Sequence, residues 1–472
     1  MSSDGEQSTA GPGVRRSGWR GLLALLSLSL ASLIWLGGLV DSLQRPSVGD
    51  ALGLRQLELN VIVAEVLPTG LQATLLGDDP RADLRTELER QLQQAPVPPP
   101  VAQRLERALL QPAAVQPVAL RDLEPLLESI DPRRRPLLQA LIDGDTMGPA
   151  HLEPLLRPWS PSPVLAQLSC ERLAGTPADC LARFGRPLPT LLRFAVVSLL
   201  PLPALLVGVL LLLRLLWQWR RGLLAPAAPL VAPPLDGLDL VLLIAGGFVV
   251  LGEVLAPLLL APLLERSLRI ANLAEPLSQG LQVLGQYLAL TIAPLAILSR
   301  QIATAASRQP RPPGGWLQWR WRPLATAASS ALAHLLMVLP LVALAGWLQE
   351  QLVGDPGGSN PLLELVLNSG DRLALGCFAL TAVIVAPLFE ETIFRGVLLP
   401  VAGRRFGGGA AVLLSAVVFA VAHLSLGELV PLLVLGLGLG WLRWRTGRLG
   451  PCVILHALWN AVTFANLIAL GS

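Results

Sequence analysis

The stretch Glu390-Glu391-Thr392-Ile393-Phe394-Arg395 places three charged residues in a segment that is otherwise apolar from Leu373 to Phe389. A charged side chain at the centre of a bilayer costs about 2.5–3.5 kcal/mol on insertion scales, so it normally faces a cavity or a partner. Two further apolar runs contain polar residues, in Phe419-Ala-Val-Ala-His423 and His456-Ala-Leu-Trp-Asn460. Three such interruptions in one hydrophobic region predict an active site inside the membrane.

The composition of the whole chain is that of a membrane protein. Of its 472 residues, 53% are hydrophobic and 15% are charged, and the mean hydropathy is +0.58. Several uncharged runs are as long as a bilayer is thick, which excludes an ordinary soluble protein. The net charge of +3 comes from arginine, since the chain has no lysine, and it is typical of the cytoplasmic ends of membrane helices. No basic region interleaved with aromatic residues indicates a nucleic-acid partner.

The apolar runs predict an all-α fold, a polytopic transmembrane helical bundle of about eight or nine spans. The candidate spans are residues 21–40, 194–213, 240–264, 280–299, 323–348, 373–400, 407–424, 429–442 and 449–471; the count falls to eight if the short run 429–442 does not cross. Arg15, Arg16 and Arg20 predict a cytoplasmic N-terminal tail at residues 1–20, followed by a retained signal-anchor helix at 21–40. Residues 194–322 hold further spans and a basic cytoplasmic loop, and residues 323–472 hold the polar motifs.

Residues 41–186 have the character of a soluble domain between the first and second spans. Leucines recur at helical spacing among charges, as in Arg85-Thr-Glu-Leu-Glu-Arg-Gln-Leu92, which predicts a small, mainly helical extracytoplasmic domain. Cys170 and Cys180 would form a disulfide if this domain faces an oxidising compartment. Two unpaired thiols are an equal alternative. We expect His151 of this domain to be solvated.

The three polar motifs lie at similar depths in their predicted helices. Counted from the cytoplasmic ends, Glu390 and His423 lie about 20 Å deep and Asn460 lies about 18 Å deep. Glu391 and Arg395, four positions apart, share a helix face and can pair. Glu390 is rotated by about 100° from its neighbour, so it can point elsewhere, into a cavity. We therefore expect the motifs to converge.

The motifs resemble those of a known family. Glu390-Glu391-x-x-x-Arg395, Phe419-x-x-x-His423 and His456-x-x-x-Asn460 are similar, in order and in position, to the three motifs of the CPBP family. That family covers type II CAAX prenyl endopeptidases and the bacteriocin-processing or abortive-infection membrane proteases. The resemblance covers residues 325–470 and implies proteolysis inside the membrane.

The resemblance also implies a role for each motif residue. Glu390 would act with His423 to activate a water molecule for attack on a peptide carbonyl. His456 and Asn460 would donate hydrogen bonds to the developing oxyanion. These residue types suit the reaction, because carboxylate and imidazole groups transfer protons and amide and imidazole donors stabilise oxyanions.

A supporting role is implied for Glu391 and Arg395, and a metal site is the open question. Glu390, His423 and His456 form a set of one glutamate and two histidines like that of some catalytic zinc sites, and the family is often called metalloprotease. The sequence contains no His-Glu-x-x-His motif. We therefore favour chemistry without a metal and keep zinc as the alternative cofactor.

The expected partners are the lipid bilayer and a membrane-associated protein or peptide substrate, whose prenylation the motifs do not specify. A non-catalytic membrane scaffold or immunity protein of the same fold is the first alternative. A transporter is the second, although it should show internal repeats, and none is evident. Outside the motifs, Glu253 needs a partner in its apolar span and has no assigned role, whereas we expect His334 to pack or to line a cavity. Trp441 and Trp444 are interpreted as interfacial anchors.

Overall fold

The computed structural model describes residues 13–45, 48–94, 100–159, 162–174, 177–306, 309–354 and 357–471. These described residues contain helices and no strand, which confirms the all-α prediction. The chain divides into two compact units. We call residues 1–48 and 203–468 the membrane unit, and residues 49–202 with 469–471 the small unit. Residues 1–12 of the predicted cytoplasmic tail lie outside the described residues.

Seven helices of the described chain are long and apolar enough to cross a membrane, so the protein is a multi-pass membrane protein. They are Gly18–Ser42, Pro187–Arg220, Gly237–Ile270, Glu275–Thr304, Leu324–Val353, Arg372–Phe406 and Gly450–Gly471. Two of the nine predicted runs are not among these seven helices. The run predicted at 407–424 forms α21 (Gly408–Val421), whose 14 residues span about 21 Å, less than a hydrocarbon core of about 30 Å. The run predicted at 429–442 forms α22 (Leu429–Thr446), which ends with Arg443 and Arg445.

The membrane unit contains both α-helices and wider π-helical segments. Its α-helices are α1 (Gly13–Ser42), α12 (Pro201–Arg220), α13 (Gly237–Val241), α14 (Ala256–Ile270), α15 (Glu275–Ala306), α16 (Leu324–Val353), α17 (Pro361–Asn368), α18 (Arg372–Ala379), α19 (Ala386–Glu391), α20 (Leu399–Phe406), α21, α22 and α23 (Gly450–Gly471). The π-helical segment η5 (Leu242–Leu255) joins α13 to α14, while η6 (Leu380–Val385) and η7 (Thr392–Leu398) flank α19. Such segments occur frequently at functional sites, and Glu390 lies between two of them.

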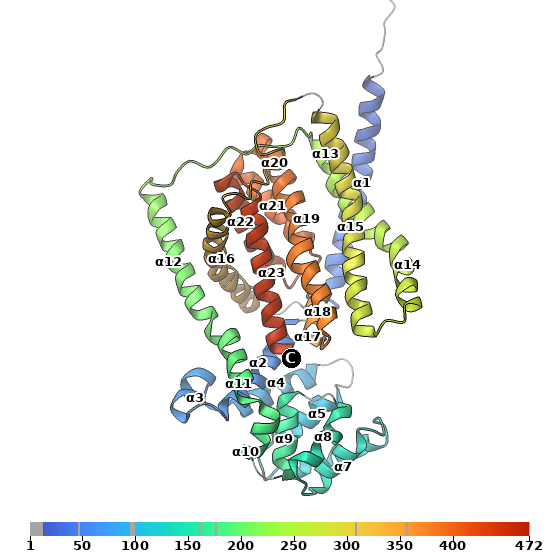
Figure 1. The fold of residues 1–472 in the computed structure, drawn as a ribbon, viewed down its shortest axis with the longest axis vertical. Helices are drawn as coiled ribbons and strands as arrows, with labels where there is room; N and C mark the ends of the chain where they lie inside the picture. Colours follow the sequence, from blue (N-terminus) through green and yellow to red (C-terminus); the bar gives the residue numbers. More distant parts are fainter. Residues whose placement is uncertain are drawn as a thin grey trace, which may run out of the picture. The chain divides into compact units, whose positions relative to one another are not determined.

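The helices around the motifs pack in two groups (Figure 1). Helix α21 packs on α20 and α22, and α22 packs on α16; on the other side, α15 packs on η5 and α18, and α1 packs on η5. A Cβ atom at Gly436 of α22 would lie 3.0 Å from the Cα atom of Ala416 in α21. Glycine is thus required for the close approach of these two helices. The shared core is aromatic and aliphatic, with Phe389, Ile393, Phe394, Phe419, Leu439 and Leu455.

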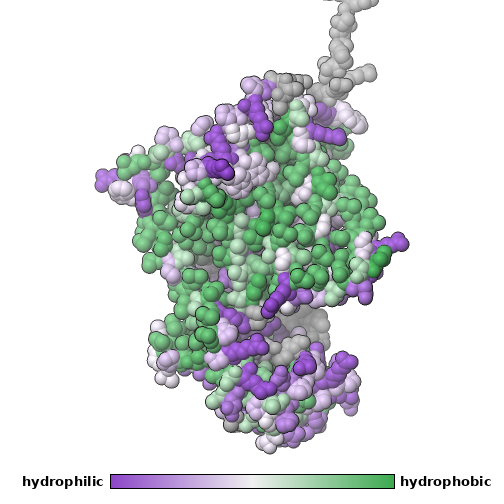
Figure 2. Space-filling model, viewed as in Figure 1, coloured by the Kyte–Doolittle hydropathy of each residue, from purple (hydrophilic) through white to green (hydrophobic). Residues whose placement is uncertain are grey.

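Apolar side chains also cover the outside of the membrane unit, and Figure 2 shows them over most of its visible face. Leu258 of α14 is 68% exposed and Ile292 of α15 is 63% exposed. Contact between so much apolar surface and water would be unfavourable. A bilayer accommodates it, in agreement with the multi-pass assignment.

The small unit is a cluster of short helices. They are α2 (Val48–Ala64), α3 (Thr69–Leu76), α4 (Pro80–Gln94), α5 (Val101–Leu109), α6 (Gln116–Arg121), α7 (Arg135–Asp143), α8 (Pro149–Leu156), α9 (Pro163–Ala174), α10 (Pro177–Cys180) and α11 (Pro187–Phe194). Leu84, Leu105 and Leu137 are fully buried in its core. A disulfide joins Cys170 to Cys180, so the bridged alternative is confirmed.

Two acidic side chains are buried in the small unit. Glu58 of α2 pairs with Arg55 at 3.0 Å, but burial still raises its pKa above the usual carboxyl value. Burial, and then the neighbouring Glu58, raises the pKa of Glu106 in α5 well above that value. Oε1 of Glu106 has no hydrogen-bond partner among the described residues. This pair makes the stability of the small unit depend on pH.

Candidate active site

Glu390 lies at the centre of the polar residues in the membrane unit. Its Oε1 accepts a hydrogen bond of 2.7 Å from the hydroxyl of Tyr287 in α15. Its Oε2 is buried and has no hydrogen-bond partner among the described residues. Oε2 lies 3.9 Å from Nε2 of His423 and 3.9 Å from Nε2 of His456. One free carboxylate oxygen therefore faces two imidazole nitrogens.

His423 lies in the turn that follows α21. Its Nδ1 is 2.7 Å from the carbonyl oxygen of Phe419, and a carbonyl can only accept, so Nδ1 carries the hydrogen. In the neutral ring, Nε2 is then an acceptor that faces Glu390. The His423 ring also contacts the Phe419 ring edge-on, with the centroids 4.6 Å apart. The predicted common face of Phe419 and His423 therefore fixes both the tautomer and the orientation of His423.

His456 of α23 is held by the second glutamate. Its Nδ1 lies 3.0 Å from Oε1 of Glu391. Because a carboxylate oxygen accepts, this nitrogen also carries a hydrogen, and Nε2 points toward Glu390. A carboxylate on one ring nitrogen orients a histidine and increases the basicity of the other nitrogen. The side chain of His456 is only 3% exposed, so its environment is set by these protein contacts.

Glu391 and Arg395 form the predicted pair. Nη1 of Arg395 lies 2.9 Å from Oε1 of Glu391, and both side chains are 0% exposed. Nη2 of Arg395 donates to the carbonyl of Gly436 in α22 at 3.1 Å. The guanidinium also lies over the ring of Phe419, 4.4 Å from its centroid. Arg395 thus joins the helix of Glu391 to both α21 and α22.

Asn460 makes a different contact from the other motif residues. Its Nδ2 donates to the carbonyl of Ala382 at 2.8 Å, which ties α23 to η6. An amide group has two Nδ2 hydrogens and an Oδ1 acceptor, so this bond uses only part of its capacity. The structure brings Glu390, His423 and His456 together and places Asn460 one helical turn beyond His456.

Motif analysis missed Tyr287, which contacts Glu390 directly. It is the only tyrosine of the chain and lies in an apolar span, where a buried hydroxyl must find a partner. A single tyrosine in an apolar run is thus a sign of a polar contact, but the sequence does not indicate that the partner is Glu390. The unassigned Glu253 accepts a hydrogen bond of 2.9 Å from Nε1 of Trp35 in α1. Nδ1 of His334 lies 2.8 Å from the carbonyl of Ser330 within α16, in agreement with a packing role.

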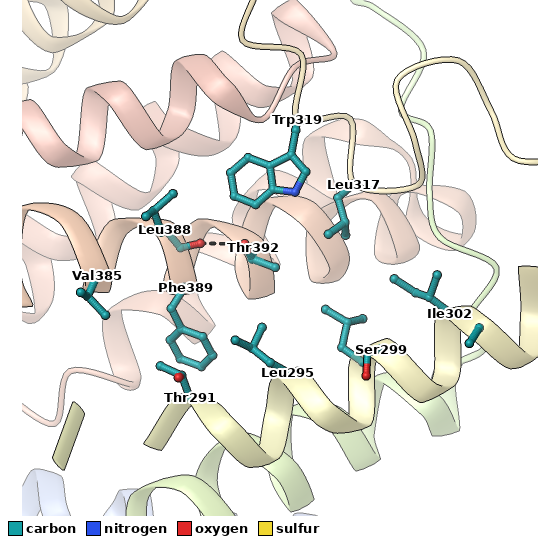
Figure 3. A pocket seen from close by; sticks show the side chains of 12 residues that line it. Thr291, Leu295, Ser299, Ile302, Leu317, Trp319, Val385, Leu388, Phe389 and Thr392 are labelled. Carbon is teal, nitrogen blue, oxygen red and sulfur yellow. Dashed lines mark hydrogen bonds between the residues drawn. The ribbon is translucent and has the colours of Figure 1, made fainter. Parts of the chain in front are cut away.

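An apolar cavity of about 640 Å³ borders the helix that carries Glu390. Figure 3 shows side chains of α15, the 317–319 loop and residues 385–392 pointing into it, including Leu295, Leu317, Trp319, Leu388 and Phe389. Its three hydroxyl side chains all donate to carbonyls of their own helices: Thr291 to Leu288, Ser299 to Ala296, and Thr392 to Leu388. The wall therefore offers mainly apolar contacts.

The described residues contain no group of three or more His, Cys, Asp and Glu side chains arranged to hold a metal ion. Glu390, His423 and His456, the set considered for zinc, do not meet this condition. We derive no step through a metal.

Comparison with known proteins finds one matching family in each of the two units. Residues 373–462 match the family described as type II CAAX prenyl endopeptidase Rce1-like, and this range includes all three motifs. The match supports the predicted CPBP-type protease domain. Residues 49–184 match a domain of unknown function, DUF8675. No curated protein and no solved structure matches the chain.

Proposed function

Because residues 373–462 form a domain of the type II CAAX prenyl endopeptidase Rce1-like family, we propose that the protein hydrolyses a peptide bond in a membrane-associated protein or peptide. The observation that carries this proposal is the unpartnered Oε2 of Glu390, 3.9 Å from Nε2 of both His423 and His456. A water molecule about 2.8 Å from two such atoms fits that separation.

Glu390 and His423 activate this water. The water donates one hydrogen bond to Oε2 of Glu390 and the other to Nε2 of His423, which is an acceptor because Nδ1 carries the ring hydrogen. As the water oxygen forms its bond to the peptide carbon, Glu390 takes the proton and the carbonyl electrons move onto oxygen. When the C–N bond breaks, that proton passes to the leaving amine.

His456 and Asn460 stabilise the oxyanion. The Glu391 carboxylate holds Nδ1 of His456 and so directs Nε2 toward the reacting carbonyl, where a hydrogen on Nε2 would be donated to the oxyanion. Asn460 offers the amide hydrogen that Ala382 does not use. A donor of this kind in a dry site contributes about 2.7–4 kcal/mol to transition-state stabilisation. Glu391 and Arg395 position these groups without contacting the substrate.

The cavity beside Glu390 receives an apolar part of the substrate. Its volume of about 640 Å³ lies in the range of ligand pockets, roughly 300–1,000 Å³. Phe389, which lines it, directly precedes the proposed base. An apolar group held there would place the adjoining peptide bond near Glu390.

The small unit faces an oxidising compartment, and the N-terminus is cytoplasmic. The Cys170–Cys180 disulfide supports the first assignment, because such bonds are rare in reducing cytosol. The arginines before the first span support the second.

The test compares the newly formed protein N-termini in membranes from cells that contain the wild type, Glu390→Gln or His423→Ala. Glu265→Gln is a matched control, because Glu265 is a membrane-unit glutamate that hydrogen-bonds Gln282 away from the site. We expect a set of N-termini that the wild type and the control produce and the two site variants do not. Identical sets in all four samples would reject the protease and favour the non-catalytic scaffold.

A further inference from the structure

We propose that Tyr287 is a positioning residue for Glu390, so that helix α15, outside the matched range 373–462, completes the active site. This inference rests on the proposed function. Its basis is the 2.7 Å hydrogen bond from the Tyr287 hydroxyl to Oε1 of Glu390. That bond occupies one carboxylate oxygen and leaves the other for the water.

The contact determines which way the carboxylate faces. The terminal torsion of a glutamate has a broad, roughly two-fold preference, so the side chain does not fix its own carboxylate plane. A hydroxyl hydrogen bond to an ionised carboxylate is short and directional, and the distance found here is of that kind. With Oε1 held by Tyr287, Oε2 stays directed at Nε2 of His423 and His456.

Tyr287 is itself held in place. Its ring packs edge-on against Phe389, with the centroids 6.4 Å apart. Helix α15 packs closely on α18: a Cβ atom added at Gly280 would lie only 2.9 Å from the Cα atom of Ala374. The donor is therefore carried by a helix that is packed tightly against the start of the Glu390 helix.

The charges around Glu390 make this donor more important. The titratable groups that face it are His423 after α21, His456 of α23, the adjacent Glu391, Tyr287 of α15 and Glu253 of η5. Glu253 interacts with Glu390 as a like charge and is held by Trp35 of α1. The hydrogen bond from Tyr287 holds the carboxylate in one orientation among these neighbours.

The test is Tyr287→Phe in the full-length protein, reconstituted in lipid vesicles with a substrate identified as above. This variant keeps the ring that packs on Phe389 and removes the hydroxyl. We expect kcat to fall by up to about 100-fold, the order of loss that a small misplacement of a catalytic group produces, with KM unchanged within about twofold.

Gln282→Ala is the matched control, because it removes the hydrogen bond from Gln282 of α15 to Glu265 of α14 without touching the site. We expect it to retain wild-type kcat and KM. If Tyr287→Phe also retains both, or changes only KM, the positioning role is overturned while the protease assignment stands. If the wild type cleaves no better than Glu390→Gln, the proposed function fails, and this inference fails with it.

Discussion

The buried Glu391–Arg395 pair allows a quantitative test of how the site is held together. Both side chains are fully buried, with Nη1 and Oε1 2.9 Å apart. In Arg395→Met, an apolar side chain replaces the cation and leaves a carboxylate in the core. Removing one partner of a buried pair costs about 3–5 kcal/mol. The lost hydrogen bond to the Gly436 carbonyl places Arg395→Met toward the upper end of that range.

The double variant Glu391→Gln/Arg395→Met separates the two causes. Neither charge then remains, so we expect it to be destabilised less than the sum of the single variants, with a coupling of about 2–3 kcal/mol, near the upper limit for contacting residues. Glutamine keeps an oxygen that can accept from Nδ1 of His456, but it no longer has the Arg395 partner that holds that oxygen in place. The double variant should therefore recover stability without recovering activity.

The assay is reversible unfolding in mixed detergent micelles, followed by tryptophan fluorescence, with substrate cleavage measured on the same preparations. Glu265→Gln, a half-exposed glutamate paired with Gln282, is the control for charge loss and should change stability by less than about 0.5 kcal/mol. If Arg395→Met costs less than about 1 kcal/mol, or if the single costs simply add, the pair does not join the helices as described.

Three further outcomes are expected. The raised pKa of Glu106 means that the small unit is most stable below the usual carboxyl pKa and loses stability as the pH rises through the raised value. Glu106→Gln should make the stability of the small unit less dependent on pH. Hydrogen exchange that shows the same pH dependence in the wild type and this variant would contradict the prediction. Leu295→Trp should fill part of the 640 Å³ cavity and raise KM for apolar substrates with little change in kcat, so an unchanged KM would separate the cavity from substrate binding. Chelators should leave cleavage unchanged within about twofold, since no group of ligands among the described residues is arranged for a metal. At a metal site, even indirect damage lowers activity by about 10–100-fold. A loss of cleavage that added zinc restores would therefore require a metal mechanism.

The motif contacts within one helix could be predicted from the sequence, because helical periodicity determines them. Glu391 and Arg395 are four residues apart and pair, while Glu390 faces a different direction from Glu391. The same periodicity places the carbonyl of Phe419 at Nδ1 of His423.

Contacts between distant helices, and the place where one helix stops, could not be predicted. Tyr287 is 103 residues from Glu390 in the sequence, and no periodic pattern selects α15 as the neighbour of α18. The run predicted at 407–424 carries no charge or proline that would end a helix, yet α21 ends at Val421 and Leu424 has a φ angle of 49°. Asn460 also bonds to a backbone carbonyl, Ala382, and backbone partners carry no sequence signal.

The early end of α21 has a consequence for hydration. Each turnover of a hydrolase consumes one water molecule, and hydrocarbon contains very little. Helix α21 stops after 14 residues, and His423 in the turn beyond it is 19% exposed, while Glu390 is 13% exposed. A helix of about 21 Å is shorter than the hydrocarbon layer, which thins locally around such an element. The path for solvent is thereby shortened, so vesicles of longer-chain lipids should slow turnover by limiting the supply of water.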